Sequence, residues 1–414
     1  MAELLAVEEA KKRLLAHFGP VDTTQVPLNN ACLGRILATD INSPIDLPPF
    51  PNSSMDGFAL RSADVRGSSA ENPATLEVIG DIPAGSVPSF TIMHGQCARI
   101  MTGAPLPEGA DAVIPVEETN AANLSSDSPL PSNIQVKRSV TAGEFVRLPG
   151  QDVRAGQLVL EKGRRLRPQD IGILAMLGIS RVQLFRQPRI ALLSTGDELV
   201  SSEEELLPGK IRESNSYSLG ALIQYYGGQV ESLGTTRDEF ALIQSRLDEA
   251  VHRGVDLIVS SAGVSVGAHD YVRAVVEKNG SLEFWRVNMR PGKPLIFGYY
   301  RNLPILGLPG NPVSSFVTFE VFVRPVLLKM SGASSLQRWT IPVILEEAIE
   351  SDGRESYLRA ILTQREGRIT AKLTGHQGSG NLFSLVQANA LLIIPSGVKS
   401  LPAGSEVQAW PLEY

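Results

Sequence analysis

Continuous apolar runs between residues 188 and 312 constrain the fold of this chain more than any other feature. Three of them open the segments RIALLSTGDE, DLIVSSAGVSVG and PILGLPGNP. A run without polar alternation is typical of a parallel strand that is buried on both faces. Helical patterns lie between the runs, in SNSYSLGALIQYYG, DEFALIQSRLDEAVHRG and DYVRAVVEKNG. Buried strands that alternate with helices predict a doubly wound α/β domain.

Short strand patterns flank this domain on both sides. TLEVIGDI, CARIMTG, DAVIPVEE and NIQVKRSV precede it, separated by Gly and Pro, and predict a small β-rich domain. The Pro-rich segment PIDLPPFPNSSMDGFAL (44–60) before them predicts an extended loop. After residue 332, short strands that end with QANALLIIPSG and EVQAW predict a small all-β tail domain.

Two helices are predicted outside the α/β domain. The N-terminal segment MAELLAVEEAKKRLLAHFG carries apolar residues at helical spacing, so it predicts an amphipathic helix. Acidic residues interrupt it, so it does not resemble a signal peptide. RPQDIGILAMLGI (167–179) predicts a second helix, with Pro168 in its first turn.

Composition narrows the classes of function. The net charge of −6 gives no basic field for nucleic acid, and no apolar stretch is long enough for a membrane helix. With two cysteines, Cys32 and Cys97, and five histidines, the chain cannot build a disulfide framework, and a Cys/His zinc site is disfavoured. A Walker A motif and a G-x-S-x-G elbow are both absent from the sequence. We therefore expect a cytoplasmic protein that binds neither nucleic acid nor membrane.

The carboxyl ends of the predicted strands gather polar side chains. Ligands of an open parallel sheet bind beyond these ends. Three of the four segments there contribute carboxylates, namely Asp197 and Glu198, Asp238, and Asp270. The four segments are STGDE (194–198), TTRDE (235–239), AGVSVGAHD (262–270) and LPGNP (308–312).

Glycines and cations accompany the carboxylates. Gly263, Ser265 and Gly267 form a loop whose backbone amides suit an anion, and RPGKP adds Arg290 and Lys293. Carboxylates beside such groups suit a phosphate ligand with Mg²⁺, which takes one or two carboxylates plus phosphate oxygens. The sequence therefore predicts a magnesium and phosphate site at this edge.

Each of these groups also fits an ordinary structural role. Asp238 and Asp270 precede helical patterns, so either is a candidate N-cap. Gly263 and Gly267 suit a tight turn without a ligand, and Lys293 suits a solvated surface. The functional interpretation rests on their gathering at one predicted edge.

Eight motifs in order along the whole chain resemble the MoeA-type molybdopterin molybdenumtransferases, a family that includes the gephyrin E domain. They are NSSMDGFAL, RIMTGAPLPEGADAVIPVEE, GQDVRAGQ, STGDEL, SNSYSL, GVSVGAHDYV, RPGKPLIFG and LPGNPVSSF.

The resemblance implies a multidomain α/β fold. An α/β/α molybdopterin-binding domain would carry an inserted β-rich domain and a C-terminal β-barrel domain. The implied domains are a discontinuous N-terminal domain of residues 1–45 and 147–186, the insertion at 46–146, the α/β/α domain at 187–331, and the barrel at 332–414.

The resemblance also implies an activity. The family inserts molybdate into adenylylated molybdopterin and releases AMP with the help of Mg²⁺, in molybdenum cofactor biosynthesis. It works as a homodimer, in which the active site is shared between subunits. A molybdopterin adenylyltransferase, which would supply the substrate, is a candidate partner.

The family motifs transfer site residues to this chain. Five would be catalytic, namely Asp56, Thr102, Glu198, Asp238 and Asp270, and the last three would also bind the metal. Taken alone, Asp56 before Gly57 fits a simple turn, and Thr102 fits the start of a loop. The substrate-binding residues would be Asp152, Ser194, Gly196, Ser216, Gly263, Ser265, Gly267, Arg290, Lys293, Pro309 and Pro312.

Two departures from the family pattern stand at this edge. Arg290 stands where many members have Lys, so a planar guanidinium with several N–H donors replaces a compact ammonium group. Ala262 stands where a Gly is usual. They leave open the preference between molybdate and tungstate. Two other functions also stay open. One is a molybdopterin adenylyltransferase, which has a similar α/β domain but no added β domains, and the other is a scaffold like gephyrin.

Overall fold

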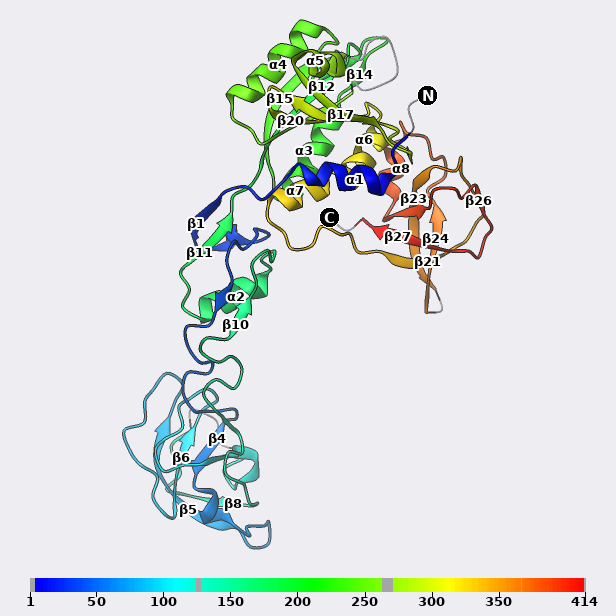
Figure 1. The fold of residues 1–414 in the computed structure, drawn as a ribbon. Helices are drawn as coiled ribbons and strands as arrows, with labels where there is room; N and C mark the ends of the chain where they lie inside the picture. The colour runs from blue at the N-terminus through cyan, green and yellow to red at the C-terminus, as the bar shows by residue number, and fades with distance from the viewer. Residues whose placement is uncertain (1–3, 124–127, 263–270, 366, 413–414) are drawn as a thin grey trace. The chain divides into compact units, whose positions relative to one another are not determined.

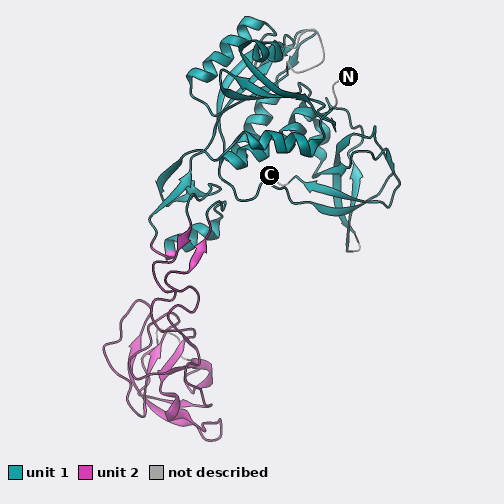
Figure 2. Ribbon diagram, viewed as in Figure 1, with its two compact units in different colours: residues 1–39, 162–175, 179–414 teal, residues 40–161, 176–178 magenta. Residues whose placement is uncertain are grey.

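The computed structural model describes residues 4–123, 128–262, 271–365 and 367–412 (Figure 1). The chain divides into two compact units (Figure 2). Unit 1 contains residues 1–39, 162–175 and 179–414, and unit 2 contains residues 40–161 and 176–178. Unit 2 is therefore inserted between parts of unit 1, as the resemblance predicted.

A six-stranded sheet in the order β15-β12-β16-β20-β19-β17 lies at the centre of unit 1. The first four strands are parallel, and the apolar runs predicted three of them, β12, β16 and β20. Two further strands, β19 and β17, were not predicted and run antiparallel at one side. The strands are β12 (Arg189–Thr195), β15 (Gln229–Thr236), β16 (Leu257–Ser261), β17 (Gly280–Arg286), β19 (Pro294–Tyr300) and β20 (Leu303–Leu308).

A two-residue turn explains the antiparallel pair. Arg301 and Asn302 alone join β19 to β20, and both have positive φ angles, 45° and 70°. Such a short connection joins antiparallel strands, whereas a parallel crossover needs a dozen or more residues.

Helices cover both faces of the sheet and form an α/β/α sandwich (Figure 1). Ile190 and Leu192 of β12 pack into one core, while Ala191 and Leu193 pack into the other. This alternation follows from the two-residue period of a strand. The first core includes α1 (Val7–Ala16), α3 (Asn215–Tyr225), α6 (Pro312–Thr318), the π-helical turn η4 (Phe319–Val323) and α7 (Arg324–Met330); the second includes α4 (Phe240–His252) and α5 (Tyr271–Asn279).

The C-terminal region closes into a five-stranded barrel, because β23 pairs with β25 as well as with β24. The short strand β18 (Met289–Arg290) adds to β23 and ties the RPGKP turn to the barrel. The barrel strands are β21 (Ile341–Leu345), β23 (Glu355–Arg365), β24 (Arg368–Leu373), β25 (Ala390–Ile394) and β27 (Glu406–Pro411).

Smaller elements complete unit 1. The helix predicted at 167–179 is α2 (Pro168–Met176), with Pro168 as its first residue. β1 (Thr23–Pro27) pairs with β11 (Arg181–Phe185). Among the described residues, no helix is both long and apolar enough to cross a membrane.

Unit 2 contains a five-stranded sheet in the order β7-β4-β6-β5-β8. The loop predicted for residues 44–60 is wrong at its end, because Gly57–Leu60 forms the buried strand β4. A Cβ on Gly57 would lie 2.0 Å from the Ile114 carbonyl oxygen, so only glycine admits the neighbouring strand at this distance. The other strands are β5 (Ala74–Ile82), β6 (Gln96–Ile100), β7 (Ala112–Pro115) and β8 (Asn133–Val136).

Candidate functional site

The predicted strand ends meet at one edge of the central sheet. Ser194 of β12 is in register with Ser261 of β16, and Ser261 is in register with Leu308 of β20. Thr195 of β12 is in register with Thr236 of β15. The antiparallel strand β19 begins at this edge, directly after Lys293. The segments 194–198, 235–239 and 308–312 and the RPGKP turn therefore gather as predicted.

Carboxylates occupy one side of this edge. Asp197 and Glu198 are exposed, and the Asp197 Oδ1 accepts a 3.3 Å hydrogen bond from the Asp238 backbone N–H. The N-cap of α4 is Glu239, so Asp238 stands one residue before the cap position.

Part of the predicted metal site lies outside the described residues. Within the described ranges, no three His, Cys, Asp or Glu side chains are grouped so that they could hold a metal ion. Asp270 lies outside the described residues, as do Gly263, Ser265 and Gly267.

A buried carboxylate that the sequence analysis missed lies next to Ser194. Glu213 is 6% exposed and accepts hydrogen bonds from Ser194 Oγ at 3.1 Å, from the Ser216 backbone N–H at 2.8 Å, and from Ser216 Oγ. It thereby joins the end of β12 to the first turn of α3. The sequence signal for it was only its position just before a helix at the predicted edge.

Asn215 extends this connection to two more strands. Its Nδ2 donates to Ser261 Oγ at 2.6 Å and to the Gly310 carbonyl at 2.7 Å. The Asn215 Oδ1 is buried and has no hydrogen-bond partner among the described residues. A carbonyl oxygen only accepts, so the bond to Gly310 fixes which amide atom faces that loop.

Three small residues at this edge have close side-chain neighbours or an unusual backbone conformation. A Cβ on Gly196 would lie 2.8 Å from Glu198 Oε2, and a Cβ on Gly310 would lie 3.1 Å from the Ala262 Cβ. Ala262 itself has a φ of 74°, in the left-handed region that favours glycine. Pro309 is buried and Pro312 is the first residue of α6, so both stiffen the last loop.

Cations lie on the other side of the edge. Arg290 and Lys293 are exposed, and Arg290 Nη1 lies 3.8 Å from Asp352 Oδ2. Hydrogen bonds from Arg354 lower the pKa of Asp352, so this carboxylate stays ionised well into the acidic range. Within the described ranges, Asp352 is the one carboxylate that pairs with Arg290, and it does so at long distance and at an exposed position.

Arg359 of the barrel was also missed. It is fully buried, and it donates to Ser384 Oγ and to the Gly378 carbonyl, both at 3.0 Å. Burial and, to a smaller extent, the charge of Arg290 lower the pKa of Arg359 to about 10, so it is still a cation at neutral pH. No described carboxylate pairs with it, which is unusual for a buried charge.

The barrel loop beside Arg359 contacts the last strand end. Ser379 accepts a 2.9 Å hydrogen bond from Asn311 Nδ2, and its carbonyl accepts one of 3.0 Å from the Val313 N–H. The barrel therefore contributes to the same edge, which no local pattern in the sequence indicated.

Two predicted residues in unit 2 lie together. The Asp56 Oδ1 accepts hydrogen bonds from the Thr102 N–H at 2.7 Å and from Thr102 Oγ1 at 2.8 Å, and both residues are exposed. This contact also has a local structural role, since it fixes the loop after β6. The exposed Asp152 pairs with Arg147.

Family models match almost the whole chain in three consecutive parts. Residues 5–178 match the MoeA N-terminal region (domain I and II), residues 191–329 match the probable molybdopterin binding domain, and residues 342–412 match the MoeA C-terminal region (domain IV). The α/β/α sandwich thus corresponds to the probable molybdopterin binding domain.

Individual relatives agree with these matches. A molybdopterin molybdenumtransferase of Nostoc is 39% identical over 91% of this chain and 86% of its own length. A molybdopterin molybdenumtransferase 2 of Mycobacterium tuberculosis is 38% identical over 94% of both chains. The crystal structure of a molybdopterin biosynthesis moeA protein from Pyrococcus horikoshii superposes with a TM-score of 0.83 at 32% identity, covering 99% of this chain and 100% of that one.

The fold and the edge define a multidomain transferase of the molybdopterin-binding class. The chain belongs to the molybdopterin molybdenumtransferase family.

Proposed function

We propose that this protein inserts molybdate into adenylylated molybdopterin and releases AMP, with Mg²⁺ assisting. The observation that carries the proposal is the carboxyl edge of the central sheet in a chain of this family. Carboxylates lie there with the Asn215 Oδ1, which has no hydrogen-bond partner among the described residues, and the barrel adds the buried Arg359 nearby. An adenylylated dithiolene substrate carries negatively charged phosphate and sulfur groups. Arginine and lysine side chains at this edge would bind these anions.

The residues present fit one Mg²⁺ ion. Glu198 and Asp238 stand on adjacent loops, and Mg²⁺ commonly takes one or two protein carboxylates with phosphate oxygens completing its shell. Asp270 follows the next strand end in the sequence and would join them. Bound there, the ion would neutralise phosphate charge as AMP leaves.

The cations would hold the anionic end of the substrate. Arg290 and Lys293 present guanidinium and ammonium donors at the barrel side of the edge, and the buried Arg359 adds a positive charge close to Arg290. Arg359 is held by two hydrogen bonds, so its orientation is set before a ligand arrives. We include Asp56, Thr102 and Asp152 of unit 2 among the active-site residues because of their family motifs.

AMP release tests the proposal. The purified protein is incubated with adenylylated molybdopterin, Mg²⁺ and molybdate, and nucleotides and metal-bound pterin are quantified. We expect AMP and molybdenum-loaded cofactor in equal amounts, and neither without molybdate or Mg²⁺. Formation of adenylylated pterin from ATP would instead identify an adenylyltransferase. A stable complex with another protein and no pterin turnover would favour a scaffold.

We further propose that the protein acts as a homodimer in the cytoplasm, by analogy with the family. Native mass spectrometry at working concentration tests the oligomeric state. Two inactive variants, one in each unit, then test a shared site. If Asp56→Asn and Glu198→Gln subunits exchange, roughly a quarter of the activity should return in a random mixture. No recovery after confirmed exchange would contradict sharing.

A further inference from the structure

Asp352 lies in the turn of the barrel that joins β22 (Ile349–Glu350) to β23. The start of β23 pairs with β18, with Met289 opposite Glu355 and Arg290 opposite Ser356. Arg354 Nη1 donates a 3.2 Å hydrogen bond to the Met289 carbonyl, which ties the turn to β18. The turn is therefore fixed beside Arg290, the residue that we expect to contact the anionic end of the substrate.

Arg354 holds the Asp352 side chain in place. The Asp352 Oδ2 accepts hydrogen bonds from Arg354 Nη2 at 2.5 Å and from Arg354 Nε at 3.0 Å, and its Oδ1 accepts one of 3.1 Å from the Arg354 backbone N–H. Arg290 Nη1 lies 3.8 Å from the same Oδ2, which is too far for a hydrogen bond. Asp352 therefore acts on Arg290 through its charge.

Positive charge exceeds negative charge around this turn. Arg290 and Arg354 both pair with Asp352. Arg359 is close enough to Arg290 for that charge to contribute to the lowering of its pKa. Within the described ranges, Asp352 is the one carboxylate that pairs with any of these three arginines. A single negative charge thus offsets three positive charges.

Arg290 and Asp352 are both accessible, since their side chains are 44% and 37% exposed. An anion in solution can therefore reach Arg290 without any change in the fold. To bind there, it must replace Asp352 as the main counter-ion of the guanidinium. Asp352 cannot assist the anion directly, because an ionised carboxylate has no proton to donate.

We propose that Asp352 is a positioning residue that acts through Arg290 as a built-in counter-ion, so that the substrate anion binds less tightly and the anionic product leaves more easily. The proposal rests on the proposed function, which supplies the anionic substrate and the product AMP. It assigns to Asp352 a role in ligand affinity in addition to its role in the turn.

Asp352→Asn separates these two roles. The substitution removes the charge, and its Oδ1 can still accept the hydrogen bond from the Arg354 N–H that shapes the turn. AMP and molybdate are titrated separately by calorimetry at low salt. We expect at least one of them to bind about two- to fivefold more tightly, which is the size of an exposed ion pair. Unchanged or weaker binding of both anions, or no binding of either, would overturn the proposal.

A double-mutant cycle tests whether Asp352 acts through Arg290. In an Arg290→Gln background, Asp352→Asn should change the affinity by less than about 1.5-fold, because the charge that it would release is already gone. The same two- to fivefold gain in the absence of Arg290 would contradict this part of the proposal.

Glu346→Gln is a matched control. It removes a carboxylate that lies 3.9 Å from Arg365, at the other end of β23. Both anion affinities should stay unchanged in this variant, and a gain like that of Asp352→Asn would overturn the proposal. If Asp352→Asn fails to fold, Asp352→Ser also removes the charge and offers a hydroxyl oxygen to the turn. The same gain in affinity is expected from it.

Steady-state kinetics separate this proposal from the proposed function. Asp352→Asn should lower KM for adenylylated molybdopterin about two- to fivefold, with kcat no higher than in the wild type, because tighter binding also retains AMP. A disturbed turn would instead raise KM. Failure of the wild type to release AMP would sink the proposed function, and the anion titrations would still decide the role of Asp352. An unchanged KM in a protein that releases AMP would sink only that role.

Discussion

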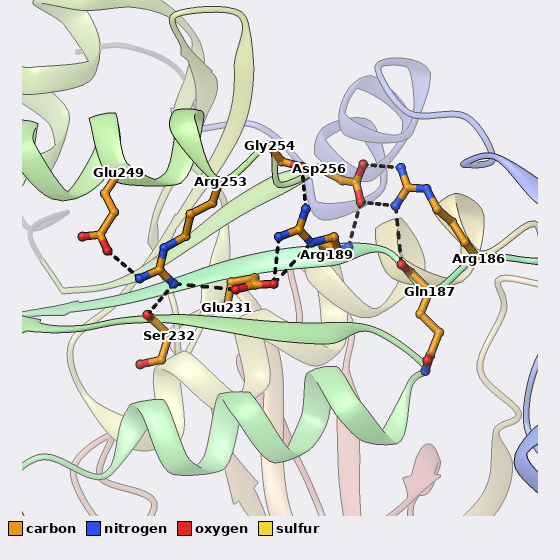
Figure 3. Close-up of polar contacts among 9 residues, drawn as sticks. All are labelled: Arg186, Gln187, Arg189, Glu231, Ser232, Glu249, Arg253, Gly254 and Asp256. Atoms are coloured by element: carbon orange, nitrogen blue, oxygen red, sulfur yellow. Dashed lines mark hydrogen bonds and ion pairs between the residues drawn. The ribbon is translucent and has the colours of Figure 1, made fainter.

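The polar side chains at the two ends of the central sheet differ in how completely they are paired. At the amino end, charged groups pair with one another (Figure 3). Asp256 accepts two 2.6 Å hydrogen bonds from Arg186 and one of 2.7 Å from the Arg189 N–H, and Arg189 pairs with Glu231 at 3.0 Å. At the carboxyl end, Asn215 Oδ1, Thr195 Oγ1 and Ser260 Oγ are buried without partners among the described residues.

We interpret this contrast as one between a structural network and the proposed binding site. Native proteins satisfy nearly all buried polar groups, so we interpret the unsatisfied ones at this edge as groups kept for the proposed ligand. The ion pairs at the amino end stabilise the fold. The unsatisfied polar atoms at the carboxyl end do not contribute in this way. Substitutions at the amino end should therefore lower the free energy of unfolding, whereas substitutions at the carboxyl end should lower turnover.

The largest effect is expected at the carboxyl end. Glu198→Gln and Asp238→Asn should each reduce molybdate insertion by at least about tenfold, because each removes a charge that would bind the metal. The melting temperature should change little, since Glu198 is exposed. Steady-state AMP release and a thermal melt check this. Near-normal turnover in both variants would remove the carboxylates from the site. The Asp270→Asn variant should behave in the same way.

The reverse outcome is expected at the amino end. Asp256→Asn should lower the free energy of unfolding by about 1–3 kcal/mol, because it leaves Arg186 with a mismatched amide. Turnover per folded molecule should not change. Denaturant unfolding measures the loss. Glu249→Gln in the more exposed pair with Arg253 is the matched control, with a loss below about 1 kcal/mol. Lost turnover in folded Asp256→Asn would contradict the contrast.

Arg290 gives a smaller and salt-dependent effect. Arg290→Ala should weaken binding of the adenylylated pterin several-fold, and Arg290→Lys should be tolerated, because the charge contributes most at an exposed position. Isothermal titration at two salt concentrations checks this. Unchanged affinity in Arg290→Ala would make Arg290 an ordinary surface residue.

The smallest effect concerns the backbone of the edge. Ala262→Gly should raise the free energy of unfolding by up to about 1 kcal/mol, because a φ of 74° strains alanine and not glycine. The gain is partly offset by the larger entropy of unfolded glycine. A clear loss of stability in a urea titration would show that the alanine side chain contributes more than its backbone costs.

Local periodicity was enough to predict most of the fold. The apolar runs gave β12, β16 and β20, and the amphipathic patterns gave α3, α4 and α5. Strand β4 was missed because Pro, Ser and Asp precede it and its burial depends on two neighbouring strands. The antiparallel strands β17 and β19 depend on a turn at Arg301 and Asn302, two residues without the usual signal for a hairpin.

In the α/β domain, the candidate site was predictable where a carboxylate or glycine followed a strand and where the RPGKP turn preceded one. Glu213 bonds a residue 19 positions away, and Asn215 bonds residues 46 and 95 positions away, so no local pattern reveals their roles. Arg359 lies inside a barrel strand and looks like an exposed residue in sequence. Arg359 stands out only because its charged side chain is buried, and burial can be seen only in the folded structure.

Hydrogen–deuterium exchange tests the central contrast most directly, because it needs no substitution. Exchange is followed with and without adenylylated molybdopterin and Mg²⁺. The ligand should protect peptides that cover 194–198, 213–216 and 308–312, and it should leave 186–189, 229–233 and 253–256 unchanged. Protection confined to the amino end, with no change at the carboxyl end, would contradict the placement of the chemistry at the carboxyl edge of the sheet.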